Sequence, residues 1–261
     1  MRSHELNLKQ YDTDKVANGY LDHYDPVFEP WVDKEIKLLE IGVHRGGSLK
    51  MWRDYFPRGT IVGVDLKDPP ADFQPGERIH TYRGSQTDTK FLTRVANEIA
   101  PEGFDIIIDD ASHVGSFAKM TFWHLFDNHL KPRGMYAIED WPSGYWGDWP
   151  DGRPLDLDRI SAPPTPPPDP TNRGFWSRVI SRIRGTRPLA CHSYGMVGFV
   201  KQLIDEQAAA DVLRLTLRNP PGRPSKFKNM LIVPGIVFVR KAGLLEPAQI
   251  RTTPSSSHVA Q

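Results

Sequence analysis

The chain has 261 residues, of which 39% are hydrophobic and 25% are charged, so it can bury a sizeable core and wholesale disorder is excluded. Its 33 basic and 32 acidic residues give a formal net charge of +1, which provides no bulk attraction for nucleic acid or an anionic membrane. The single cysteine, Cys191, excludes a disulfide scaffold and cysteine-ligated metal sites and favours a reducing, cytoplasmic location. The apolar runs are too short to span a bilayer, so we expect a soluble protein.

Short apolar runs alternate with segments of helical spacing along most of the chain. Residues 1–34 are polar and aromatic and predict a helical lead-in, and residues 35–250 form one predicted domain. The alternation predicts an α/β fold, in which a doubly wound, mostly parallel sheet is covered by helices on both faces. The predicted strands are 37–42, 59–65, 78–83, 104–109, 135–139, 212–217 and 230–240, and the predicted helices are 47–56, 88–99, 117–130 and 195–207.

The segment 141–194 interrupts this alternation and is rich in proline and tryptophan. Ten of the 24 prolines fall between Trp141 and Pro188, which predicts extended, stiff stretches. A short basic amphipathic stretch, 175–184, is compatible with a membrane surface, an anionic acceptor or a lid, and its isolation favours a lid. We therefore interpret 141–194 as a lid insert and expect 251–261 to be a disordered tail.

A glycine-containing loop follows the first predicted strand. A dinucleotide-binding loop would require glycine at position 44, where this chain has His44, and no Lys-Ser/Thr pair follows Gly47 as a P-loop requires. An adenosine ligand without a phosphate fits better, and S-adenosylmethionine (SAM) has that form. The alternative is that the glycines of residues 42–47 only form a tight turn.

Several residues at the predicted strand ends are candidates for contact with SAM. Gly42 would let its methionine part approach the backbone, and Glu40 would lie near the amino group or the sulfonium. Asp65, at the end of the second strand, suits the ribose hydroxyls, although such an acid also serves NAD. Ser85 and Gln86 follow the third strand, where the adenine edge would lie.

Two acidic pairs follow the fourth and fifth predicted strands. The first is Asp109-Asp110 and the second is Glu139-Asp140. Carboxylates that converge at one sheet edge repel one another, and a divalent cation removes that conflict. Three oxygen ligands without a thiol favour Mg²⁺, and we assign Asp110, Glu139 and Asp140 to the metal. Asp109 would face the cofactor or support the loop; the alternative is that the first pair caps a helix and the second is solvated.

His113 lies three residues after Asp110, so it can sit beside the metal without binding it. Mg²⁺ lowers the pKa of a hydroxyl that it binds, and a neutral imidazole can accept that proton near neutral pH. We therefore predict that His113 deprotonates a diol held on the metal. The resulting alkoxide would attack the methyl group of SAM, and much of the rate would come from holding the two reactants in contact.

Four motifs resemble the metal-dependent sugar O-methyltransferases that modify macrolide deoxysugars, and the methylmannose-polysaccharide methyltransferases look similar too. They are Leu38–Val43, Gly46–Pro57, Ile107–His113 and Ile138–Asp140. The stretch Tyr11–Lys15 resembles a family motif that usually reads Tyr-Gly-Thr-Asp-Lys, with Asp12 in place of glycine.

This resemblance implies a class I methyltransferase fold with a seven-stranded sheet and an antiparallel last strand. It implies SAM and Mg²⁺ as cofactors, the same three carboxylates as metal ligands, and His113 as the base. Within the resembling motifs, Tyr11, Thr13 and Ser48 are further candidates for contact with SAM.

Aromatic residues follow directly after the predicted metal ligands. Four of them, Trp141, Tyr145, Trp146 and Trp149, could stack on a sugar ring, or they could pack the insert onto the core, and the sequence favours neither. The predicted function is transfer of a methyl group to a hydroxyl of a saccharide or glycosylated natural product, polysaccharide biosynthesis included. The alternatives are an NAD-linked oxidoreductase and a non-catalytic SAM-binding or membrane-surface protein. We expect no nucleic-acid partner and no stable membrane insertion, and the oligomeric state, a homo-oligomer included, stays open.

Overall fold

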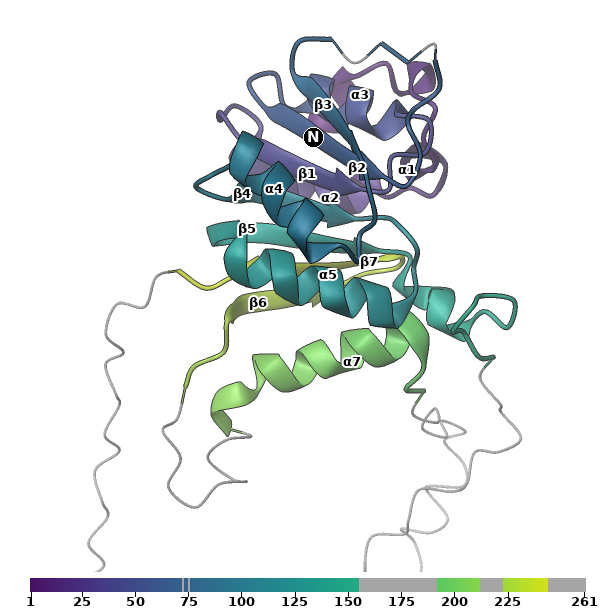
Figure 1. Ribbon diagram of the computed structural model, residues 1–261, viewed down its shortest axis with the longest axis vertical. Helices are drawn as coiled ribbons and strands as arrows, with labels where there is room; N and C mark the ends of the chain where they lie inside the picture. Colours follow the sequence, from purple (N-terminus) through teal and green to yellow (C-terminus); the bar gives the residue numbers. More distant parts are fainter. Residues whose placement is uncertain (72, 75, 155–191, 212–222, 244–261) are drawn as a thin grey trace, which may run out of the picture.

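The computed structural model describes residues 1–71, 73–74, 76–154, 192–211 and 223–243. The described residues form a central sheet with helices on both faces (Figure 1). Most of the predicted lid insert, the predicted strand 212–217 and the predicted tail lie outside these residues. No helix among the described residues is both long and apolar enough to cross a bilayer.

The sheet has seven strands in the order β3-β2-β1-β4-β5-β7-β6. Neighbouring strands from β3 to β5 are parallel, whereas β7 runs antiparallel to both β5 and β6. This is the mixed sheet of a class I methyltransferase fold, as predicted, with the last strand antiparallel. The strands are β1 (Lys37–Ile41), β2 (Thr60–Asp65), β3 (Ile79–Arg83), β4 (Phe104–Asp109), β5 (Leu130–Glu139), β6 (Phe227–Ile232) and β7 (Ile236–Lys241).

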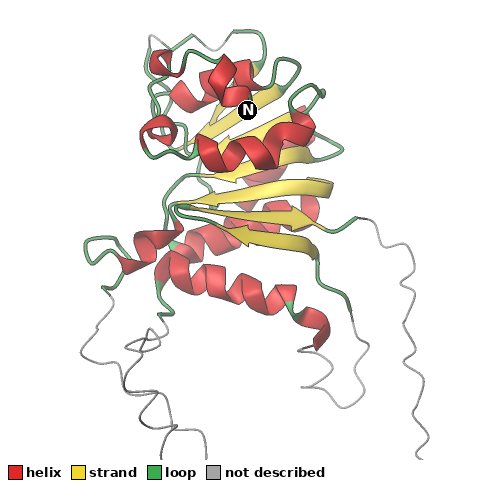
Figure 2. Ribbon diagram, turned by 180° about the vertical axis from the view of Figure 1, so that it is seen from behind, coloured by secondary structure: helices red, strands yellow, loops and turns green. Residues whose placement is uncertain are grey.

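Each face of the sheet carries its own buried apolar cluster. One cluster lies under the helices α4 (Thr89–Ile99), α5 (Gly115–Asn128) and α7 (Gly195–Gln207), and these helices lie along the same face in Figures 1 and 2. The other lies under α3 (Gly47–Tyr55) and the N-terminal region. That region contains α1 (Asp14–Ala17), α2 (Leu21–Phe28) and the 3₁₀ turns η1 (Arg2–Glu5), η2 (Leu8–Gln10) and η3 (Glu29–Trp31); a fourth 3₁₀ turn, η4 (Trp141–Tyr145), follows β5.

The topology places the ends of the parallel strands at one edge. Strand β1 lies between β2 and β4, so the chain order reverses beside β1. In open sheets of this kind, ligands bind beyond the carboxyl ends of the strands at such a reversal. The predicted site residues after β1, β2, β4 and β5 are therefore brought to a common edge.

Two predicted strands differ from the observed ones. Strand β5 begins at Leu130, five residues before the predicted start, because its first residues pair with Phe104 across an irregular register. The predicted strand 230–240 is a hairpin formed by β6 and β7. Pro234 has no N–H to donate, and Gly235 adopts a φ of 78°, so the chain turns between the two strands.

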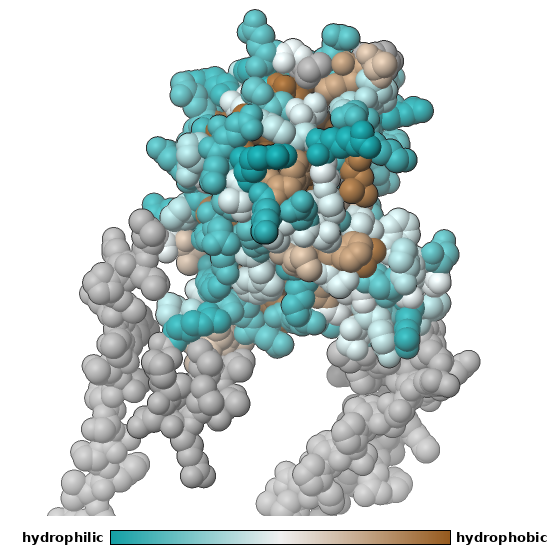
Figure 3. Space-filling view, in the orientation of Figure 1, coloured by the Kyte–Doolittle hydropathy of each residue, from teal (hydrophilic) through white to brown (hydrophobic). Residues whose placement is uncertain are grey.

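The surface is mostly polar on the face shown in Figure 3, where hydrophilic side chains predominate and apolar ones form separate small patches. Two of the exposed apolar side chains, Leu66 and Phe117, flank the cavity described next.

Candidate active site

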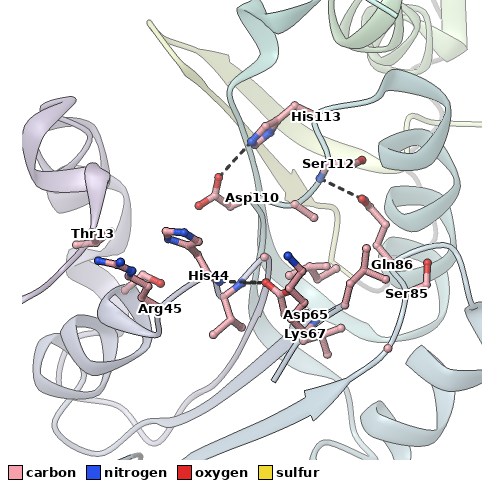
Figure 4. A pocket seen from close by; sticks show the side chains of 18 of the residues that line it. Thr13, His44, Arg45, Asp65, Lys67, Ser85, Gln86, Asp110, Ser112 and His113 are labelled. Atoms are coloured by element: carbon pink, nitrogen blue, oxygen red, sulfur yellow. Dashed lines mark hydrogen bonds and ion pairs between the residues drawn. The ribbon is translucent and has the colours of Figure 1, made fainter. Parts of the chain in front are cut away.

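A cavity of about 890 Å³ lies at the carboxyl ends of the parallel strands. Figure 4 shows its lining residues coming from the N-terminal region, the β1–α3 loop and the segments after β2, β3 and β4. The structure brings nine predicted site residues to this cavity. They are Thr13, Gly42, Ser48, Asp65, Ser85, Gln86, Asp110, His113 and Asp140.

Seven predicted site residues do not line the cavity. Tyr11 is buried and donates a hydrogen bond to Asp54. Glu40 is fully buried and accepts hydrogen bonds from Ser48 and Trp52. The other five are Asp109, Glu139, Trp141, Tyr145 and Trp146.

The loop after β1 is shaped by Gly42 and Asp65. Gly42 has a φ of 94°, and a Cβ there would lie 2.0 Å from the carbonyl oxygen of Asp110, so the close approach of two chain segments requires glycine. Oδ2 of Asp65 accepts hydrogen bonds from the backbone N–H groups of Val43 at 2.8 Å and His44 at 3.0 Å (Figure 4). Asp65 therefore fixes the loop that forms one wall of the cavity.

The carboxyl group of Asp65 is held in its charged form. Burial raises its pKa, but the backbone hydrogen bonds from Lys67, His44, Val43 and Leu66 outweigh burial and leave the pKa lowered. A charged acceptor at the end of β2 can bind hydroxyl donors from the cavity, because each carboxylate oxygen accepts more than one hydrogen bond.

Gln86 connects the β3 edge of the cavity to the segment after β4. Its Oε1 accepts a hydrogen bond from the N–H of Ser112 at 3.1 Å, as drawn in Figure 4. Its Nε2 lies 3.4 Å from Oδ1 of Asp109. Asp109 therefore supports the cavity wall from behind, one of the two roles considered for it from the sequence.

Asp109 is buried on the core side of this wall. Burial raises its pKa from 3.8 to about 7, against the opposing hydrogen bonds from Tyr136 and the N–H of Ala111. The folded protein thus holds a proton that the unfolded chain has already released. The contribution of this protonated carboxyl group to the free energy of unfolding is therefore lost as the pH rises from about 4 to about 7.

The Asp109→Asn variant should lose this pH dependence. The stability of the variant relative to the wild type should increase with pH, by at most about 1.4 kcal/mol per pH unit. Urea unfolding in EDTA at about pH 5 and about pH 8 measures the difference. An equal difference at both pH values would contradict the shifted pKa.

The acidic residues at the ends of β1, β4 and β5 surround a buried lysine. Nζ of Lys15 lies 2.5 Å from Asp110, 2.9 Å from Glu139 and 3.2 Å from Glu40. The side chains of Lys15 and Glu40 have no exposed surface, and that of Glu139 is 1% exposed. One ammonium group therefore faces three carboxylates, of which Glu40 and Glu139 are buried and Asp110 is 18% exposed at the cavity.

Lys15 only partly offsets the effect of burial on the pKa values of these acids. Burial raises the pKa of Glu139 well above its usual value and also raises the pKa of Asp110 and of Glu40, although Lys15 opposes all three shifts. For Lys15, burial lowers the pKa, but the three carboxylates outweigh burial and raise it. Additional positive charge near these acids would therefore be favourable.

Asp110, His113 and Asp140 converge at the cavity surface. Nε2 of His113 lies 3.4 Å from Oδ2 of Asp140 and 3.8 Å from Oδ1 of Asp110. The ligand atoms of the three residues all lie within 4.8 Å of one another. His113 and Asp140 have φ values of 49° and 51°, a left-handed conformation that is uncommon for residues other than glycine and concentrates at functional sites.

This donor set fits a small, hard divalent cation. Carboxylate oxygens predominate, the group opens onto the cavity, and the acids behind it share a single ammonium group, that of Lys15. Glu139, the third predicted ligand, lies behind the group instead, where both of its oxygens contact Lys15 and Tyr24 donates to it at 2.5 Å. The structure thus brings together two of the three predicted metal ligands and places His113 next to them.

The aromatic segment after β5 packs onto the site. Nε1 of Trp141 donates to the carbonyl of Val233 at 3.0 Å, and the ring of Tyr145 contacts that of His192. Trp146 is 42% exposed and packs edge-on against Trp149. These contacts favour the packing interpretation for Trp141 and Tyr145 and leave Trp146 accessible.

Trp149, also considered for sugar stacking from the sequence, packs against His113. Its Nε1 donates to the carbonyl of His113 at 2.9 Å, and the two ring centroids are 5.8 Å apart. Ser143 donates to the same carbonyl at 3.2 Å. The segment after β5 therefore fixes the backbone of His113 in its left-handed conformation.

Lys15, Tyr20 and Tyr24 were not predicted as site residues. Tyr20 donates to Asp140 and Tyr24 to Glu139, so the N-terminal region completes the acidic cluster. Two sequence signals existed. Lys15 ends the stretch that resembles a family motif, and Tyr20 and Tyr24 are four residues apart and can share a helix face. Nothing in the sequence indicates which acids they meet.

Known proteins that are similar in sequence to this chain include sugar O-methyltransferases. No protein-family model matches the chain. The mycinamicin VI 2''-O-methyltransferase of Micromonospora griseorubida is 40% identical over 146 residues, which are 52% of this chain and 35% of that protein. The 8-demethyl-8-alpha-L-rhamnosyl tetracenomycin-C 2'-O-methyltransferase of Streptomyces olivaceus is 38% identical over 134 residues, 49% of this chain and 34% of that protein. The chain resembles the sugar O-methyltransferases.

A solved structure supports the same resemblance. The MycE methyltransferase of the mycinamycin pathway, in complex with Mg and S-adenosylhomocysteine (SAH), superposes with a TM-score of 0.60 at 29% identity. The match covers 85% of this chain and 49% of that protein. The chain thus spans about a third of the length of these curated relatives and half of that structure.

Proposed function

We propose that the chain is a SAM- and Mg²⁺-dependent O-methyltransferase that acts on a hydroxyl group of a saccharide or glycosylated natural product. The observation that carries the proposal is the position of Asp110, His113 and Asp140 at the border of the same cavity that Asp65 and Gly42 shape. The same cavity can therefore hold the methyl donor next to a side chain that accepts a proton. The relatives named above act on glycosylated compounds, which supports the acceptor class.

The cavity offers suitable contacts for each part of SAM. Asp65 would bind the ribose hydroxyls, and Ser85 and Gln86 would lie near the adenine edge. Leu66 and Phe117, which are 66% and 44% exposed, offer apolar surface to the adenine ring. Ser48 and the loop at Gly42 would face the methionine part.

Asp110 and Asp140 would hold Mg²⁺, with Glu139 behind them as a third acid. Bound Mg²⁺ would lower the pKa of an acceptor hydroxyl, and SAM would supply the methyl group. The hydroxyl proton passes to Nε2 of His113. The methyl group of SAM would then pass from sulfur to this oxygen, and SAM would leave as neutral SAH.

The acceptor would enter from the side of the aromatic segment. Trp146 is the accessible ring there, and a sugar can stack its apolar face on an exposed indole. We further propose that the chain acts in the biosynthesis of a polysaccharide or of a glycosylated small molecule. The single cysteine supports a cytoplasmic location for it.

The test is methyl transfer from SAM with a labelled methyl group to a panel of monosaccharides, oligosaccharides and glycosylated polyketides. We expect label in at least one glycoside, loss of transfer in EDTA and recovery when Mg²⁺ is restored. Transfer that is undiminished in EDTA would remove the metal from the proposal, and label in none of the glycosides would remove the acceptor class.

A further inference from the structure

The carboxylates of the proposed metal site are held from the N-terminal region. Lys15 contacts Asp110, and Tyr20 donates a hydrogen bond to Asp140. These donors precede their acceptors by 95 and 120 residues, so the fold alone brings them together.

The two oxygens of each carboxylate have different partners. Oδ1 of Asp140 accepts the hydrogen bond from Tyr20, whereas Oδ2 faces Nε2 of His113 at 3.4 Å. In the same way, Oδ2 of Asp110 contacts Lys15 and Oδ1 faces His113. One oxygen of each acid is therefore tied to the N-terminal region, and the other is directed at the proposed cation position.

The ring of Tyr20 is held in place by the turn between β6 and β7. Tyr20 is 7% exposed and packs under the turn between β6 and β7. A Cβ at Gly235 in that turn would lie 2.5 Å from the hydroxyl oxygen of Tyr20. Only glycine at this position lets the ring reach Asp140.

We propose that Tyr20 is a positioning residue for the metal site, which holds Asp140 so that its second oxygen faces the cation. This inference rests on the proposed function, since it assumes that Asp140 binds Mg²⁺. Among the described residues, Tyr20 and His113 are the side chains that form a hydrogen bond or an ion pair with the carboxylate of Asp140. Partners of this kind orient metal ligands, and their loss weakens metal binding.

The test is Mg²⁺ binding by titration calorimetry with neither SAM nor acceptor present, so the readout does not depend on activity. Tyr20→Phe removes one hydroxyl and keeps the ring. We expect about 10- to 100-fold weaker Mg²⁺ binding than in the wild type. Gly235→Ala keeps the hydroxyl but displaces the ring, and it should weaken Mg²⁺ binding in the same direction.

Tyr55→Phe is the matched control. Tyr55 is also buried and donates its hydroxyl to a carboxylate, but this carboxylate, Asp25, does not line the cavity as Asp140 does. This variant should lower the melting temperature and leave Mg²⁺ affinity unchanged. Equal loss of affinity in Tyr20→Phe and Tyr55→Phe would assign Tyr20 a general structural role and overturn the inference.

The inference and the proposed function fail in different ways. Wild-type protein that binds no Mg²⁺ would overturn the proposed metal dependence and the role of Tyr20 with it. Wild-type protein that binds Mg²⁺ while Tyr20→Phe binds it equally well would overturn the role of Tyr20 alone.

Discussion

Replacing His113 with asparagine should lower the rate of methyl transfer by about 100- to 10,000-fold, the usual contribution of a general base. Asparagine tolerates the left-handed backbone that His113 adopts, so the variant removes the base without adding strain. SAM affinity and Mg²⁺ affinity should stay near their wild-type values. Single-turnover methyl transfer gives the rate, and calorimetry gives the two affinities.

The control for this prediction is His124→Asn. His124 lies on α5, where its Nε2 pairs with Thr93 at 3.0 Å, and it does not line the cavity. This variant should transfer methyl groups at nearly the wild-type rate. Normal turnover in His113→Asn would remove the base assignment, and loss of Mg²⁺ binding in that variant would make His113 a metal ligand instead.

Replacing Lys15 with methionine should lower the free energy of unfolding by about 3–5 kcal/mol in EDTA, the usual cost of breaking a buried ion pair. The substitution leaves Glu40, Asp110 and Glu139 without their shared counter-charge. Their folded pKa values are already raised, so the folded state releases protons only at higher pH than the unfolded chain does. Stability is then lost as the pH rises, and the deficit of the variant should be larger at about pH 8 than at about pH 5.

Lys131→Met is the matched control. Nζ of Lys131 lies 2.8 Å from Asp105, a distance similar to the contacts of Lys15, but its side chain is 29% exposed. We expect a loss of about 1 kcal/mol or less, because solvent screens such a pair. Urea unfolding measures both variants. A Lys15→Met protein as stable as Lys131→Met at about pH 8 would show that the acidic cluster does not depend on Lys15.

The order of strands and helices could be predicted from the sequence, because each depends on a local pattern. The apolar runs that end at Ile41, Asp65 and Asp109 form strands with nearly the predicted bounds. Parallel strands bring their carboxyl ends to one edge, and this rule was enough to bring Asp65, Asp110 and His113 to one cavity.

The contacts between distant segments could not be predicted in this way. Lys15 is a polar residue in a polar segment, and only the folded chain shows that it is buried among acids from three strands. Glu40 was predicted to face SAM because it precedes Gly42. The pleat of β1 and the packing of α3 turn it toward Ser48 and Trp52 instead.

The hairpin of β6 and β7 shows the same limit at short range. An apolar run with one proline and one glycine was interpreted as a continuous strand. Pro234 and Gly235 turn the chain, and the turn covers Tyr20. Because this turn was not predicted, its contact with Tyr20 could not be predicted either.

The central claim is that carboxylates at the ends of β4 and β5 hold a divalent cation beside the methyl donor. The most direct measurement is anomalous diffraction from crystals grown with Mn²⁺ in place of Mg²⁺ and with SAH. We predict one strong peak at direct bonding distance from oxygens of Asp110 and Asp140, next to His113 and the sulfur of SAH. Bound SAH with no peak at these carboxylates would contradict the account.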